Sequence, residues 1–266
     1  MRRSLVVALT LFIVVVSAAG VRAQRRWFQQ TPVDAPIDKA PTYDGKFTFA
    51  RLKFTTGPGG YYFFGLPAWA HGYIPIPQRG ENSRSEDDLV KILKAVSDMS
   101  IHLDGTKVVD VSDPELFMYP VVYTTEPGFM ELSDKDVANL REYLLKGGFV
   151  IFDDFRGQDW YNFSENMRRV FPNEQLVQLD VTHPIFHSFF DIKTLDFEQA
   201  YDRGGPAQFW GMFPNNDRSK PLRLIANFNN DVSQYWQWSD TGYAPVDLSN
   251  EAYKLGVNYV IYAMTH

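Results

Sequence analysis

The sequence predicts one α/β domain built around a parallel sheet. Short apolar runs alternate with amphipathic helical stretches from residue 47 to the C-terminus. Two of these runs are joined by a single helix with short connections, which is typical of a right-handed parallel crossover. The chain has 266 residues, of which 45% are hydrophobic and 22% charged, and these values fit an ordinary globular protein.

The clearest local signals surround this crossover. After the apolar run at 120–124, Ser133 is placed to cap a helix, with Asp136 at the third helical position. The glycines at 147–148 end that helix, because glycine adopts the left-handed cap conformation without strain. The continuous apolar run at 149–152 follows at once, so we expect a buried central strand there.

The remaining elements follow from periodicity and capping. In chain order we expect an extended leader at 24–46, a strand at 47–54, an irregular excursion at 61–77, a helix opening at Ser85, a strand at 108–111, a helical turn after Asp113, a helix near 162–171, a strand at 177–179, a helix start at 183–186, a strand at 222–228 and a final helix capped by Ser249. No second linker interrupts this series, so residues 47–266 are expected to form a single domain.

The first 23 residues have the pattern of a signal peptide. Arg2 and Arg3 precede an apolar run at 5–16, and small residues lead to Ala23. This run is short for a bilayer span, which needs about 20 residues. We therefore expect cleavage near Ala23, a periplasmic or secreted protein, and no membrane span in the mature chain. The alternative is an uncleaved N-terminal anchor.

Composition excludes several classes of function. Cleavage removes three arginines and no acid, which takes the formal charge from −6 to −9. Such a protein repels phosphate backbones, so nucleic acid is not an expected partner. The chain contains no cysteine, which excludes a disulfide, a thiol nucleophile and a thiolate metal ligand.

Several separated motifs resemble one known family. They are Leu140-Arg141-Glu142-Tyr143-Leu144, Gly147-Gly148-Phe149, Asp153-Asp154, His183-Pro184-Ile185-Phe186 and the closing run at 255–263. In this order they resemble the bacterial family called domain of unknown function 4159, over residues 47–266. That family is similar in fold to class I glutamine amidotransferases and trehalose-utilisation-type proteins. The resemblance therefore implies a doubly wound, flavodoxin-like sheet, and it implies no activity.

The amidotransferase likeness also predicts what is missing. The nucleophile of those enzymes is a cysteine on a tight turn after a central strand. The matching turn here carries Asp153 and Asp154. A carboxylate cannot form the thioester that glutamine hydrolysis requires, so we expect no amidotransferase activity by that route.

Ligands of open α/β sheets bind beyond the carboxyl ends of the strands. Glu126, the Asp153–Asp154 pair and Asp231 all follow predicted strands. Neighbouring side chains on an extended chain point opposite ways, so one of the pair is expected to face a crevice and the other to cap a turn. Such acids suit acid catalysis, a hard cation such as Mg²⁺ or Ca²⁺, or simple capping with a salt bridge to Arg156.

Other residues add candidates of different kinds. His183 and His187 have helical spacing for a metal pair, although Pro184 favours His183 as a cap. Aromatic residues near 61–73 and 235–238 suit stacking on a sugar, or attachment of long loops to the core. The catalytic candidates are Asp153, Asp154, Glu126 and His183. The ligand-binding candidates are Asp154, Arg156, Asp159, Asn230, Asp231 and Trp236.

Three hypotheses of function follow. The first is a non-catalytic envelope protein, a degenerate amidotransferase-like domain that binds a small molecule, a glycan or a protein and needs no cofactor. The second is a metal-dependent or carboxylate-based hydrolase that uses the acidic cluster, with a divalent cation as its cofactor. The third is a structural partner in an envelope complex, for which a large exposed apolar patch is expected.

Overall fold

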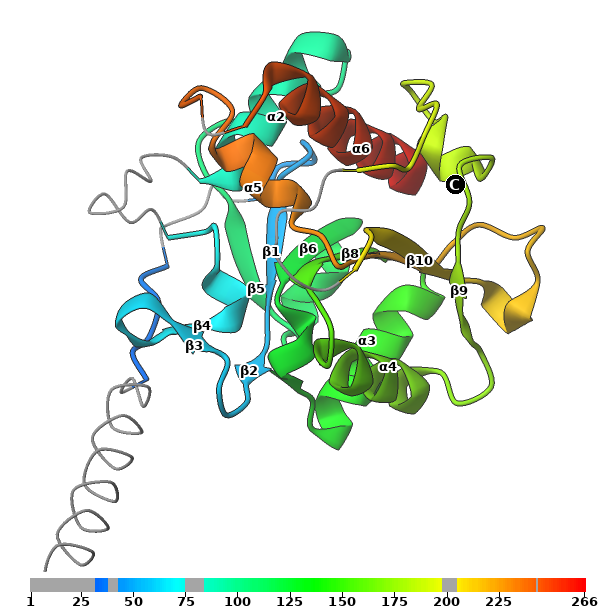
Figure 1. Ribbon diagram of the computed structural model, residues 1–266. Helices are drawn as coiled ribbons and strands as arrows, with labels where there is room; N and C mark the ends of the chain where they lie inside the picture. Colours follow the sequence, from blue (N-terminus) through cyan, green and yellow to red (C-terminus); the bar gives the residue numbers. More distant parts are fainter. Residues whose placement is uncertain (1–31, 38–42, 75–83, 198–204, 243) are drawn as a thin grey trace, which may run out of the picture.

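The computed structural model describes residues 32–37, 43–74, 84–197, 205–242 and 244–266 (Figure 1). The expected signal peptide and its cleavage site lie outside the described residues. In residues 32–37, which belong to the expected leader, Ala35 packs into the core. Among the described residues, no helix combines the length and the apolar character needed to cross a bilayer.

A seven-stranded mixed sheet forms the centre of the fold, and it confirms the predicted α/β class. Its strand order is β5-β1-β6-β8-β11-β10-β9, and the first five strands are parallel. Strand β10 is antiparallel to both of its neighbours. The strands are β5 (Lys107–Asp110), β1 (Ala50–Lys53), β6 (Val121–Thr125), β8 (Phe149–Phe155), β11 (Leu224–Phe228), β10 (Gln208–Met212) and β9 (Leu176–Gln178).

Within the described residues, two small antiparallel pairs and six short 3-10 helices complete the connections. The pairs are β2 (Thr55–Thr56) with β7 (Met130–Glu131), and β3 (Tyr61–Tyr62) with β4 (Leu66–Pro67). The short helices are η1 (Phe63–Gly65), η2 (Ala68–Ala70), η4 (Pro114–Met118), η5 (Pro127–Phe129), η6 (Pro184–Phe186) and η7 (Pro214–Asn216).

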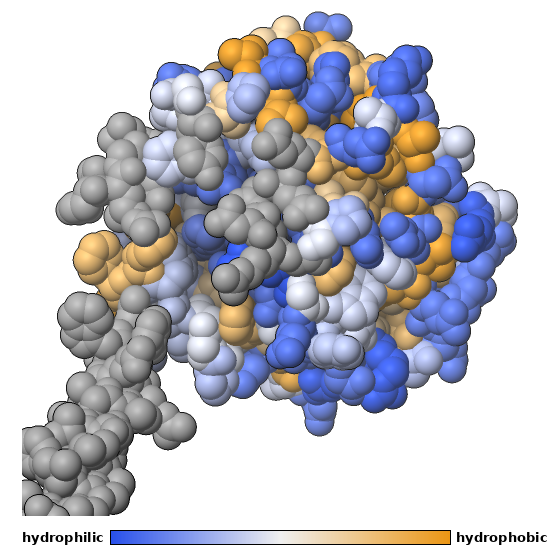
Figure 2. Space-filling model, viewed as in Figure 1, coloured by the Kyte–Doolittle hydropathy of each residue, from blue (hydrophilic) through white to orange (hydrophobic). Residues whose placement is uncertain are grey.

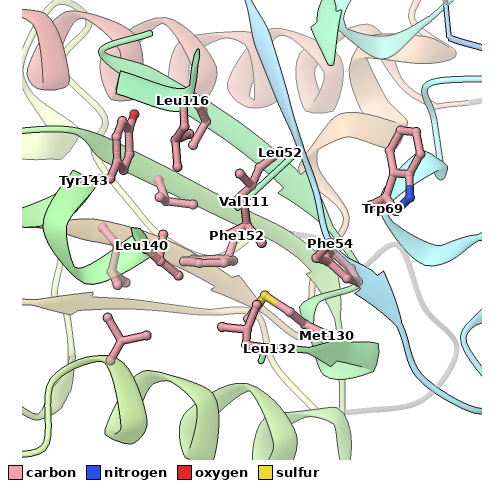
Figure 3. Packing of buried hydrophobic residues seen from close by; sticks show 14 of the residues in the cluster. Leu52, Phe54, Trp69, Val111, Leu116, Met130, Leu132, Leu140, Tyr143 and Phe152 are labelled. Atoms are coloured by element: carbon pink, nitrogen blue, oxygen red, sulfur yellow. The ribbon is translucent and has the colours of Figure 1, made fainter. Parts of the chain in front are cut away.

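Longer helices flank the sheet in two groups (Figure 1). One group is α2 (Ser85–Val96), α5 (Val232–Gln237) and α6 (Val246–Thr265), and the other is α3 (Asp134–Leu145) and α4 (Asp159–Val170). Each group packs on its own hydrophobic cluster. In the cluster under α3 and α4, Figure 3 shows Leu140 of α3 beside Phe152 of β8.

Strand β8 separates the two clusters and occupies the middle of the sheet. Phe149 and Ile151 belong to the cluster under α2, α5 and α6, whereas Val150 and Phe152 belong to the cluster under α3 and α4. All seven residues of β8 are buried. This two-sided burial explains why the run is continuously apolar instead of alternating.

The predicted capping box at Ser133 is confirmed, because Ser133 and Asp136 exchange both hydrogen bonds at the start of α3. Other predictions need correction. Strand β1 starts at Ala50, since Phe47 makes only an isolated bridge to Ile101. The final helix starts at Val246 after Pro245, so Ser249 lies inside its first turn and does not cap it.

Candidate functional site

Three carboxylates meet where the parallel strands end. Glu126 follows β6, Asp154 lies near the end of β8, and Asp231 follows β11. The carboxyl ends of neighbouring parallel strands lie at the same edge of a sheet, which brings these residues together. A fourth residue, His71, comes from the excursion between β4 and α2.

The imidazole of His71 lies between the carboxylates. Its Nδ1 is 2.5 Å from Oδ2 of Asp154 and 3.3 Å from Oε1 of Glu126. His71, Asp154 and Asp231 each place one donor atom within 4.8 Å of the others. We call these four residues, His71, Glu126, Asp154 and Asp231, the edge cluster.

Two members of the edge cluster have an unusual backbone. Glu126 and Asp154 adopt the left-handed conformation, with φ of 50° and 58°. Non-glycine residues rarely adopt it, and strain of this kind costs about 1–3 kcal/mol. Backbone hydrogen bonds hold both residues: Glu126 N donates to the carbonyl of Asp153, and Asp154 N donates to that of Asn230. The bend at Asp154 turns its carboxylate away from that of Asp153 and towards His71.

Asp153 has a different environment, although it adjoins Asp154. Its carboxylate accepts hydrogen bonds from Tyr123 Oη, Asn227 Nδ2 and the backbone N–H groups of Val232 and Ser233. Burial, followed by the nearby charge of Asp231, raises the pKa of Asp153 to about 7. Asp153 thus anchors the start of α5 beneath the surface.

The charges within the edge cluster raise the pKa values of His71 and Asp231. Burial alone lowers the pKa of His71, but the charge and hydrogen bond of Asp154, together with Glu126, outweigh it and raise this pKa well above 6.5. Burial and the charge of Asp154 raise the pKa of Asp231 to about 7. The carboxylates of the edge cluster therefore favour a positive charge beside them, and either a bound proton or a cation can supply it.

A buried ion pair positions His71. The guanidinium of Arg51, on β1, pairs with Glu86 at the start of α2, and both side chains are fully buried. Arg51 Nη1 also donates to the carbonyl oxygens of Trp69 and His71 and to Oγ1 of Thr125. One guanidinium therefore connects the excursion, α2 and the end of β6 that precedes Glu126.

The edge cluster opens into a pocket of about 350 Å³. Its polar lining includes His71, Glu126, Asp154, Arg156 and Asp159, and the rings of Tyr61, Tyr62, Phe129 and Phe155 form much of the remaining wall. Pockets of this size suit small molecules.

Several predicted candidates lie at this edge. Arg156 and Asp159 line the pocket, and the carboxylate of Asp159 accepts the backbone N–H of Arg156. Asn230 is fully buried, and its Oδ1 accepts the backbone N–H of Asp231. Asp231 also caps α5 through the N–H of Gln234.

Two predicted candidates lie elsewhere. Trp236 is fully buried in α5, and its ring lies 5.8 Å from that of Tyr123, so it is a core residue and offers no platform to a ligand. The region around it was expected to be a loop, but Asp153 and Asp231 cap a short helix there. His183 caps η6, where its Nδ1 accepts the N–H of Ile185.

The alternative of a histidine metal pair gains no support from the geometry, and the favoured role of His183 as a cap is confirmed. The segment after His183 is a single 3-10 turn, so the four-residue spacing does not align the two imidazoles as an α-helix would. His187 instead contacts Asp191 and the carbonyl of Val181.

His71 was not predicted as a site residue. It does not directly follow a predicted strand, and it belongs to an excursion that was expected to lie on the surface. The apolar segment at 66–70 could have indicated that this excursion returns to the core. Its residues Leu66, Ala68, Trp69 and Ala70 are all buried and belong to the cluster that packs on the sheet.

Comparison with known proteins gives a family. No curated protein matches the chain. The family model described as Domain of unknown function (DUF4159) matches residues 78–264, which include Glu126, Asp154 and Asp231 but not His71. Because that match covers more than half of the chain, this protein belongs to the DUF4159 family.

Proposed function

We propose that this protein is an exported binding protein whose pocket at the edge cluster takes a small polar ligand of the carbohydrate class. The observation that carries the proposal is the composition of one pocket, which combines carboxylates, a guanidinium and aromatic rings. The signal-like pattern of the first 23 residues supports export to the periplasm or beyond.

The chemistry of the pocket supports a sugar. Sugar rings have apolar C–H faces that pack on aromatic rings, and Tyr61 and Tyr62 offer such surfaces at the pocket wall. Sugar hydroxyls are donors and acceptors, which carboxylates such as Asp159 and the guanidinium of Arg156 can satisfy.

We also assign the fold more finely, as a degenerate amidotransferase-like, doubly wound sheet. The support is the strand order: the chain passes from β1 to β5 on one side and then to β6 on the other. Such a reversal marks the crevice where ligands of these folds bind. The nucleophilic cysteine of amidotransferases is absent from the chain, which favours binding over that catalysis.

A carboxylate-based hydrolase is the second candidate. It is favoured by the hydrogen bond between His71 and Asp154 in the same pocket as Glu126, because acids and bases within reach of one ligand can transfer protons to it.

A glycan array followed by calorimetry with the purified protein tests the proposal. We expect one class of glycan to bind, and Tyr61→Ala to weaken it at least tenfold through loss of the stacking surface. Tyr161→Ala is the matched control, since this ring is 74% exposed on α4 and does not line the pocket. Absence of any glycan ligand, or equal affinity in both variants, contradicts the proposal. Cleavage of the bound glycan identifies the hydrolase instead.

A further inference from the structure

We propose that His71, Asp154 and Asp231 bind one divalent transition-metal cation. The inference goes beyond ligand binding by the pocket and does not depend on it. It rests on the donor geometry, the burial of the carboxylates, the rigid support of each donor, and access from the pocket.

The three donors come from separate parts of the chain. His71 belongs to the excursion before α2, Asp154 to the end of β8, and Asp231 to the N-cap of α5. Their donor atoms nevertheless lie within 4.8 Å of one another. Ligands that share a cation at about 2.1 Å lie up to about 4 Å apart, so small side-chain rotations bring these atoms into coordination.

Burial makes a cation favourable here. The carboxyl residues Asp154 and Asp231 are only 4% and 5% exposed, and Oε1 of Glu126 lies 3.3 Å from the same imidazole nitrogen. Three carboxylates and one imidazole thus lie together, and two of these carboxylates are poorly solvated. Buried carboxylates of this kind are paired or coordinate metals, because isolated charge is costly away from water.

Contacts outside the three donors fix their positions. Asp231 Oδ1 accepts hydrogen bonds from Ser233 Oγ and from the N–H of Gln234. The carbonyl of His71 accepts from Arg51, which is itself paired to Glu86. Such supporting contacts orient metal ligands and reduce the cost of assembling them. His71 and Asp154 also line the pocket, which gives a cation and its water ligands a route of entry.

The donor types select the metal. An imidazole nitrogen beside two carboxylates suits Zn²⁺, Mn²⁺ or Co²⁺ better than Ca²⁺, which prefers oxygen ligands alone. The imidazole of His71 therefore changes the expectation of a hard cation that the acidic residues suggest by themselves.

Calorimetric titration of the untagged, chelator-treated full chain with Zn²⁺ tests the site. We expect saturable binding of one ion per chain, and His71→Ala and Asp231→Asn should each weaken it at least about 100-fold. His102→Ala is the matched control, because His102 forms a comparable pair with Asp44 at 2.8 Å outside the pocket, and it should keep the affinity of the unsubstituted chain.

A second measurement does not depend on the variants folding. Co²⁺ added to the unsubstituted chain should give visible absorption bands of a nitrogen- and oxygen-ligated ion, and Zn²⁺ should displace them. Absence of one-to-one binding overturns the proposal, as does unchanged affinity in His71→Ala; either result leaves His71 as an imidazolium paired with its carboxylates. Because no sugar is present in these titrations, their failure is distinct from failure of the glycan experiment.

Discussion

Asp153 and Asp154 are adjacent in the chain but have different roles: the first holds the start of α5, and the second belongs to the edge cluster. An extended backbone already points neighbours to opposite sides, and the left-handed conformation of Asp154 adds a bend. The first carboxylate is enclosed by donors from β6, β11 and α5, whereas the second reaches His71 and the pocket. At another position, the side chain of His183 caps a 3-10 turn, and the burial of its ring disfavours protonation.

His183 should make stability depend on pH. Burial lowers the pKa of His183 from 6.5 to about 4, so the folded chain keeps the ring neutral while the unfolded chain protonates it. This contribution is complete above pH 6.5 and is lost as the pH falls towards 4. For a partly exposed ring we expect a loss of about 1–2 kcal/mol.

Urea unfolding between pH 7 and pH 4 measures this effect. His183→Asn keeps an acceptor for the N–H of Ile185 but does not titrate, so its stability should fall less steeply than that of the unsubstituted chain. Equal slopes for the two proteins would show that His183 is solvated in the folded state.

At the scale of elements, α5 is a short helix that depends on hydrogen bonds from another element, strand β8. It has only six residues, which is too short to be stable alone. The carboxylate of Asp153 accepts two of its first N–H groups, and Asp231 accepts a third. Its hydrophobic residues Val232 and Trp236 then pack on the sheet.

Asp153→Ala should therefore destabilise α5 specifically. Four donors lose their acceptor, and unsatisfied buried donors of this kind cost about 3–5 kcal/mol in total. Hydrogen exchange should show lost protection across Val232–Gln237. As the comparison, Ser133→Ala removes one cap of α3, costs about 1 kcal/mol and should leave exchange in α5 unchanged. Uniform loss of protection across the chain would argue against a local role for Asp153.

At the scale of the whole molecule, one sheet joins two hydrophobic clusters. Successive residues of β8 at 149–152 alternate between the two clusters, so neither can lose its packing without exposing the strand that the other needs. The face in Figure 2 has hydrophobic residues, in orange, interspersed with hydrophilic ones, in blue.

Substitutions on the two sides of β8 should weaken one common transition. Val150 and Ile151 are both fully buried but face different clusters, and truncation of each to alanine should cost about 2–4 kcal/mol. Urea unfolding followed by far-ultraviolet circular dichroism and by tryptophan fluorescence should give coincident curves for both variants. Two separated transitions would show that the helical layers unfold independently.

Much of the fold follows from local sequence. The capping box at Ser133, the glycines at 147–148 and the apolar run after them depend on neighbours in the chain, and they predict α3 and the start of the central β8 correctly. The turn expected at Asp153–Asp154 is wrong, because β8 continues through both residues to Phe155. Strand β10 and helix α5 were not predicted. Strand β10 depends on pairing with distant β11, and α5 depends on a cap from β8, so periodicity within either segment could not reveal them.

The sequence by itself determined the α/β class, the parallel crossover from β6 through α3 to β8 and the absence of a thiol nucleophile, because these depend on period, caps and composition. It also placed Glu126, Asp154 and Asp231 close to the carboxyl ends of strands. Only the tertiary structure decided that His71 joins them, that Asp153 turns to α5 and that Trp236 lies in the core. Those outcomes depend on contacts between residues far apart in the chain, which the two-sided packing of the sheet and the buried Arg51–Glu86 pair bring together.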